Sequence, residues 1–274
     1  MLTFLKQEFD QLITFSKVEW QKVLTYRVSV FTYRVAEISE TCILVAMWIF
    51  IYAQGATVIR GYTANEMITY VLIGSLCAAV TRNFIHQSMS KDIEKGDLSL
   101  FLVKPVSYIK YNIYSEFGGL VLTLCASIAS QLCIIAFFFD RLVPNTDIRY
   151  LAIIVVMLFL AFFIEILIGL LVGLMAFWTD GEVGGFHQLS YVLKRFFSGA
   201  YFPLSLLPVS LAFVGYYLPF AYSFFVPAQL YLGKMGLDVA ARGLLIQLGW
   251  IVMLSLIVRI VWKRGLKKYE AVGS

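Results

Sequence analysis

The longest apolar stretch of the chain, Ile148–Trp178, reads IRYLAIIVVMLFLAFFIEILIGLLVGLMAFW, and it decides the fold class. A helix of about 20 apolar residues is enough to cross the hydrocarbon core of a bilayer. This stretch is longer than that, and Glu165 is its one acidic residue. It therefore predicts a transmembrane helix.

The composition extends this interpretation to the whole chain. Of the 274 residues, 60% are hydrophobic and 14% are charged, and the mean hydropathy is +0.81. A soluble domain carries about 45–50% apolar and about 25% charged residues. These values exclude a disordered protein and an ordinary soluble enzyme, and the length leaves room for about six spans. The predicted fold class is an all-α polytopic membrane protein with six transmembrane helices.

Three regions are expected along the chain. Residues 1–27 are predicted to form an interfacial amphipathic helix, because apolar residues recur there at helical spacing and polar residues fill the other side. Residues 28–264 form the six-span domain, and residues 265–274 form a cytoplasmic tail. Thr179 and Glu182 have the spacing of a capping box, which predicts a helix start there. The expected spans are residues 28–53, 66–84, 111–139, 148–178, 186–202 and 243–262.

Proline marks the segment before the last span. Pro203, Pro208, Pro219 and Pro227 fall within 25 residues of mostly apolar sequence. Proline removes a backbone donor, and lipid does not tolerate free backbone groups. Residues 203–233 are therefore expected to be broken helices that enter the membrane from the exoplasmic side and return.

The distribution of basic residues predicts the orientation. With the N-terminus inside, the cytoplasmic regions carry 13 Lys and Arg and the outer loops carry 5. The positive-inside rule then places both termini in the cytoplasm and favours an even number of spans.

The sequence contains no recognisable nucleotide-binding, redox or metal-binding motif. Its one Gly-Lys pair, Gly233-Lys234, has no glycine cradle before it, so the chain has no nucleotide-binding P-loop. The cysteines form no CxxC pair and the two histidines have no metal-ligand spacing. We therefore expect no enzyme, no bound cofactor or metal and no nucleic-acid partner.

Several motifs resemble those of type-2 ABC transporter permeases, the membrane subunits of bacterial ABC exporters. The similar stretches are Ile93–Leu98 (IEKGDL) with Lys104-Pro105-Val106, the run Ser198–Leu204 (SGAYFPL) with the prolines after it, and the tail Gly265–Gly273 (GLKKYEAVG). The resemblance covers nearly the whole chain.

The resemblance implies a half-transporter of a bacterial plasma membrane. Such permeases pair with an identical or sister permease and act on two copies of a cytoplasmic ATPase, which binds the ATP and Mg. Residues 86–110 would form the cytoplasmic coupling loop, with Ile93, Glu94, Lys95, Gly96, Asp97 and Leu98 contacting the ATPase. An ordinary solvated loop is the alternative, which composition alone favours. Gly199, Pro203, Pro208 and Pro219 would form an exoplasmic gate.

Three charges lie deep in the expected spans. Glu165 lies 15 residues before the turn near Asp180, and Lys194 and Arg195 lie 14 and 15 residues after it. At 1.5 Å per residue, all three are about 22 Å from the turn, so Glu165 is expected within reach of Lys194 or Arg195. The cations either contact an anionic substrate group or only pair with Glu165, and the second interpretation is favoured. Gly169 and Gly173 form a GxxxG motif for close helix packing.

The predicted function is that of a permease subunit of an ATP-driven exporter for an amphipathic, lipid-like or drug-like compound. One alternative is an ion-coupled secondary carrier with Glu165 as its proton site. A non-transporting membrane scaffold is the other.

Overall fold

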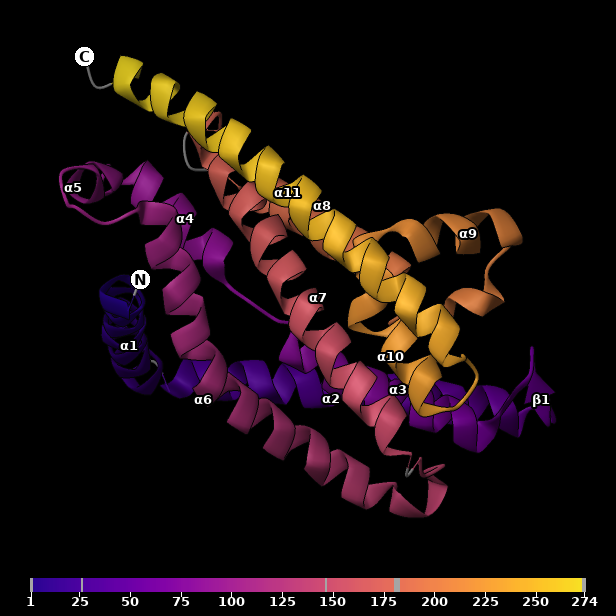
Figure 1. Ribbon diagram of the computed structural model, residues 1–274. Coiled ribbons are helices and arrows are strands. Elements are labelled where there is room, and N and C mark those ends of the chain that lie inside the picture. Colours follow the sequence, from indigo (N-terminus) through magenta and orange to yellow (C-terminus); the bar gives the residue numbers. More distant parts are fainter. Residues whose placement is uncertain (1, 26, 146, 180–182, 273–274) are drawn as a thin grey trace.

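The computed structural model describes residues 2–25, 27–145, 147–179 and 183–272 and is almost entirely helical (Figure 1). The one sheet among these residues is a two-stranded hairpin of β1 (Val58–Ile59) and β2 (Tyr62–Thr63). The α-helices are α1 (Leu2–Thr25), α2 (Arg27–Ala53), α3 (Ala64–Val80), α4 (Ile85–Glu94), α5 (Leu98–Leu102), α6 (Tyr108–Phe137), α7 (Ile148–Leu174), α8 (Gly184–Phe197), α9 (Val209–Tyr217), α10 (Phe225–Tyr231) and α11 (Leu237–Val272). The 3₁₀ helices are η1 (Phe139–Arg141), η2 (Met175–Phe177), η3 (Leu204–Leu206) and η4 (Pro219–Ser223).

Side-chain hydrogen bonds cap the N-termini of α3 and α7. Thr63 and Glu66 form a capping box at α3, with each side chain bonded to the other residue's backbone N–H. Asp147 accepts the backbone N–H of Arg149 at the start of α7. The Arg149 side chain also donates to this carboxylate, which lowers the pKa of Asp147 below its ordinary value. The expected capping box of Thr179 and Glu182 lies partly outside the described residues.

Five helical stretches are long and apolar enough to cross a membrane: Phe31–Ala53, Ala64–Glu94, Tyr108–Phe137, Ile148–Phe177 and Leu237–Tyr269. They correspond to five of the six expected spans. The remaining expected span, residues 186–202, contains α8, which has 14 residues and is about 21 Å long. This length is shorter than the roughly 30 Å hydrocarbon core, so the count of six stays a prediction.

The prolines of residues 203–233 lie at helix starts. Pro203 and Pro208 directly precede η3 and α9, and Pro219 is the first residue of η4. Pro227 lies in the first turn of α10, where its missing N–H has no intrahelical acceptor. The segment is therefore a series of short helices, as its proline content predicts.

Both ends of the chain lie at the same end of the molecule (Figure 1). Phe15 and Trp20 of α1 contact the first half of α6: the Phe15 ring packs edge-on against Tyr111, and Trp20 Nε1 donates to the Gly118 carbonyl at 2.6 Å. At the other terminus, α11 continues unbroken beyond the expected last span to Val272 and reaches α4 and α5. Residues 265–272 of the expected tail are thus part of one helix with the last span.

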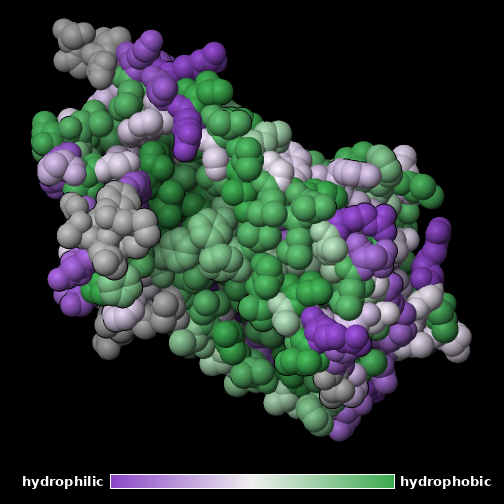
Figure 2. Space-filling view, in the orientation of Figure 1, coloured by the Kyte–Doolittle hydropathy of each residue, from purple (hydrophilic) through white to green (hydrophobic). Residues whose placement is uncertain are grey.

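An apolar surface separates two hydrophilic ends. Figure 2 shows hydrophobic side chains across the middle of one face, with hydrophilic side chains gathered towards the two ends. α7 and α11 lie side by side through this middle zone. This arrangement fits a chain whose central zone is surrounded by lipid.

Candidate functional site

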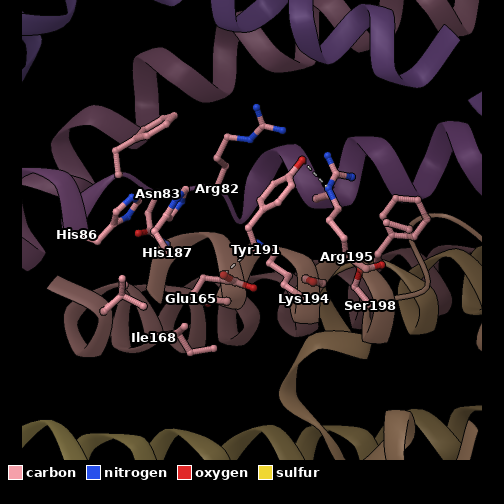
Figure 3. A pocket seen from close by; sticks show the side chains of 18 of the residues that line it. Arg82, Asn83, His86, Glu165, Ile168, His187, Tyr191, Lys194, Arg195 and Ser198 are labelled. Carbon is pink, nitrogen blue, oxygen red and sulfur yellow. Dashed lines mark hydrogen bonds and ion pairs between the residues drawn. The ribbon is translucent and has the colours of Figure 1, made fainter. Parts of the chain in front are cut away.

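A cavity of about 360 Å³ lies between α2, the α3–α4 junction, α7 and α8 (Figure 3). Its walls combine apolar residues with an unusual number of charged and polar ones for the interior of a membrane protein. Ser223 and Phe224 line it beside Ser198 and Ala200, at the far end of α8 from His187. The ionisable residues in its wall, tyrosine aside, are Glu37, Glu40, Arg82, His86, Glu165, His187, Lys194 and Arg195.

The expected pairing of Glu165 is confirmed. Lys194 Nζ lies 3.0 Å from Glu165 Oε2, and the Glu165 side chain is only 8% exposed. The two residues face each other because α7 and α8 form an antiparallel pair in which both lie at the same depth.

Arg195 pairs elsewhere. It forms an ion pair with Glu40 of α2, and its Nε donates to the Tyr191 hydroxyl at 3.1 Å. The guanidinium also lies over the Tyr191 ring, 5.3 Å from the ring centroid. Equal depth along the hairpin of α7 and α8 does not indicate Glu40, because Glu40 belongs to α2. The sequence feature that points to it is the spacing of Arg34, Glu37 and Glu40, which lie three residues apart on one face of α2.

A second charge cluster lies on the α2 side of the cavity. Glu37 is 4% exposed, and its Oε2 is 2.6 Å from Arg34 Nη1 in the same helix. Its Oε1 is 3.8 Å from Nη2 of Arg82, which follows α3. Arg82 is one of the 13 basic residues assigned to the cytoplasmic side from the sequence, and the structure places it in the cavity wall.

Two histidines meet at the cavity end that lies near α4. The rings of His86 and His187 stack with centroids 4.1 Å apart and planes 13° apart. The two histidines are far apart in the sequence, so their contact could not be predicted from it. Among the described residues, no group of three or more His, Cys, Asp or Glu is arranged to hold a metal ion.

The expected coupling residues form the junction between α4 and α5. Gly96 lies in the turn with φ = +78°, a conformation that glycine adopts without strain. Ile93 and Leu98 are buried, at 7% and 0% exposure, in an apolar cluster with residues of α7 and η2. Glu94, Lys95 and Asp97 are exposed. The junction thus has an anchored face and a free face, and only the second is available to a partner.

Side chains from distant elements hold this junction. Tyr269 of α11 donates its hydroxyl proton to the Gly96 carbonyl at 3.0 Å. Tyr108, at the start of α6, donates to Asp92 Oδ2 at 2.8 Å, and its ring stacks on Trp262. The α4–α5 junction is therefore connected directly to two long helices.

The expected gate residues are spread over the opposite half of the molecule. Gly199 has φ = +80°, and its carbonyl accepts the Tyr70 hydroxyl at 2.6 Å. Pro203 and Pro219 are buried and Pro208 is exposed. Of the four, Gly199 is the one that lies between two cavity-lining residues in the sequence, Ser198 and Ala200.

Comparison with known protein families gives a match over most of the chain. The family described as "ABC-2 family transporter protein" matches residues 38–273, which includes the cavity, the α4–α5 junction and the proline-rich segment. No curated protein matches the chain.

Proposed function

The chain belongs to the ABC-2 family of transporter proteins, and on this basis we propose that it is the permease subunit of an ATP-driven exporter. The family membership makes it the membrane subunit of an ABC transporter. The direction of transport and the class of substrate are our proposal. The substrate would be an amphipathic, lipid-like or drug-like compound, carried across a bacterial plasma membrane.

The observation that carries the proposal is the two-faced junction of α4 and α5. Its free face presents the charges of Glu94, Lys95 and Asp97 and, on α5, the exposed side chain of Leu100. Its anchored face packs against α7 through Ile93 and is bonded to α11 through Gly96. A force applied to the free face would therefore reach two membrane helices without a flexible linker between them. This is what a coupling element requires, and a solvated loop would lack the anchors.

Six crossings with both termini in the cytoplasm fit the course of the chain after α7. His187 lies beside His86, at the α4 end of α3, whereas Lys234 Nζ is 2.7 Å from the Gly61 carbonyl, just before the opposite end of α3. The segment from α8 to α10 therefore covers the length of α3, about 26 Å. We propose that the fifth crossing is made by residues 186–202, as expected from the sequence, and that residues 203–233 are the re-entrant part that closes the exoplasmic side.

The proposed partners would supply the nucleotide-binding site for which the sequence has no P-loop. Two copies of a cytoplasmic ATPase would bind ATP and Mg and dock on the α4–α5 junction. A second permease, identical or sister, would complete the pathway. The bilayer would surround the rest of the chain.

Co-purification from membranes tests the proposal, with a photo-crosslinking amino acid at Leu100 and a control at Tyr217, which is exposed on α9. We expect a nucleotide-binding subunit to cross-link at Leu100 and not at Tyr217, and we expect ATP hydrolysis by the purified complex in lipid vesicles. Uptake driven by a proton gradient in vesicles of the isolated chain would instead support the carrier that uses Glu165. If neither activity occurred and no ATPase cross-linked, a scaffold role would replace both.

A further inference from the structure

The cations in and beside the cavity are not equally neutralised. Three of them each have a carboxylate within 3.0 Å, so their charge is already matched inside the protein. Arg82 has no such partner: among the described residues, the nearest carboxylate oxygen is Glu37 Oε1 at 3.8 Å. The matched pairs are Arg34 with Glu37, Lys194 with Glu165, and Arg195 with Glu40.

The contact between Arg82 and Glu37 is too long for a hydrogen bond. Glu37 is also committed to Arg34, which is closer by more than 1 Å. The Arg82 side chain is 31% exposed, and it lines the cavity. A guanidinium carries five N–H donors in a planar fork that matches a phosphate or carboxylate group. Arg82 thus has charge and donors available to a ligand.

Arg82 also lies where the backbone is irregular. α3 and α4 belong to one apolar stretch long enough to span a membrane, yet residues 81–84 interrupt the helix. Irregular backbone at membrane depth is tolerated where it lines a cavity, and broken helices form the binding sites of many transporters. The first turn of α4, which has no side-chain cap, lies in the same wall and adds partial positive charge.

We propose that Arg82 binds the anionic headgroup of an amphiphile in this cavity. The headgroup would be a phosphate, sulfate or carboxylate held by the guanidinium fork. Apolar side chains of the same cavity, such as Phe84, Ile168 and Phe224, would contact the start of its apolar part. The cavity volume of about 360 Å³ lies in the range of small-molecule sites. This inference deepens the proposed function by naming the substrate's charge, and it transfers the anion contact from Lys194 and Arg195 to Arg82.

Binding to the isolated full-length chain tests the inference without the ATPase. The probe is a dansyl-labelled alkyl phosphate, added to the chain in phosphatidylcholine nanodiscs and displaced by unlabelled dodecyl phosphate, dodecyltrimethylammonium or inorganic phosphate. We expect dodecyl phosphate to compete at least tenfold better than the other two. Equal competition by the ammonium compound would refute the anionic preference. Equal competition by inorganic phosphate would assign the site to a small soluble anion and refute the amphiphile.

Variants of the same chain locate the site. We expect Arg82→Gln to weaken alkyl phosphate binding about tenfold or more, and Arg82→Lys to weaken it less, because lysine keeps the charge and loses the fork. Arg242→Gln, a control at an exposed arginine of α11, should bind as the wild type does. If Arg82→Gln does not fold, Arg82→Met, which keeps the length and the apolar stem of the side chain, replaces it and should weaken binding as much. Unchanged binding in the neutral variant at residue 82 would overturn the proposal. Because the ATPase takes no part, these results do not depend on whether the chain forms an exporter.

Discussion

The ion pair of Lys194 and Glu165 allows a quantitative test of the charge arrangement. At 3.0 Å and an effective dielectric constant of about 20, the attraction between the two charges is about 5–6 kcal/mol before desolvation is subtracted. Removing one partner of a buried pair costs about 3–5 kcal/mol, because the other charge stays buried without a partner. Lys194 is 24% exposed, which reduces this cost.

The two single variants should therefore differ. We expect Lys194→Gln to lower the free energy of unfolding by about 2–3 kcal/mol, because it leaves the 8%-exposed Glu165 carboxylate without a cation. Glu165→Gln should cost about 1 kcal/mol, because the longer lysine side chain can extend towards water. The free energy of unfolding of the double variant should lie within about 1 kcal/mol of the wild-type value, which gives a coupling energy of about 2–4 kcal/mol.

The measurement is unfolding of the purified protein in mixed micelles, followed by circular dichroism. Arg242→Gln serves as the control, because its pair with Asp238 is more than 70% exposed on both sides and should contribute less than about 1 kcal/mol. If the double variant were destabilised by the sum of the two single effects, about 3–4 kcal/mol, the two side chains would not be energetically coupled and the reasoning would fail. If the double variant were stable and yet lost transport, Lys194 would act on the substrate as well as on Glu165.

Three further variants test other parts of the structure. Gly199→Ala should lower the thermal unfolding midpoint by several degrees, because a Cβ there would lie 2.7 Å from the Tyr70 hydroxyl on a backbone with φ = +80°. Tyr269→Phe should leave stability within about 1 kcal/mol and reduce ATP-driven transport, measured as export per ATP hydrolysed, because it removes the bond to the Gly96 carbonyl. Trp20→Phe should expose α1 to limited proteolysis by removing its hydrogen bond to α6, and unchanged cleavage would contradict this role.

The sequence predicted those features that depend on one element or on two adjacent ones. The apolar runs predicted the five long helices, the prolines predicted the short ones, and equal depth predicted the pairing of Glu165 with Lys194. The partner of Arg195 required the position of α2 against α8, which tertiary packing determines. The helix interruption at residues 81–84 contains no proline or glycine, so the sequence did not predict it. The position of Arg82 in the cavity wall could therefore not be predicted either.

Helix α4 connects the two regions to which we assign functions, the α4–α5 junction and the cavity. Its last residue, Glu94, precedes the turn before α5, and its first residues line the cavity beside Arg82. The helix has 10 residues, so these ends are about 15 Å apart.

The GxxxG glycines let α4 lie directly on α7. A Cβ at Gly169 would meet Ile85 at 2.4 Å, and a Cβ at Gly173 would meet Met89 at 2.9 Å. Close packing of this kind resists bending of α4. In the exporter that we propose, a force on the α4–α5 junction would therefore tilt α4 and displace the cavity wall that holds Arg82. ATP hydrolysis by the partner would then change the affinity of the proposed anion site directly, without passing through the segment of residues 203–233.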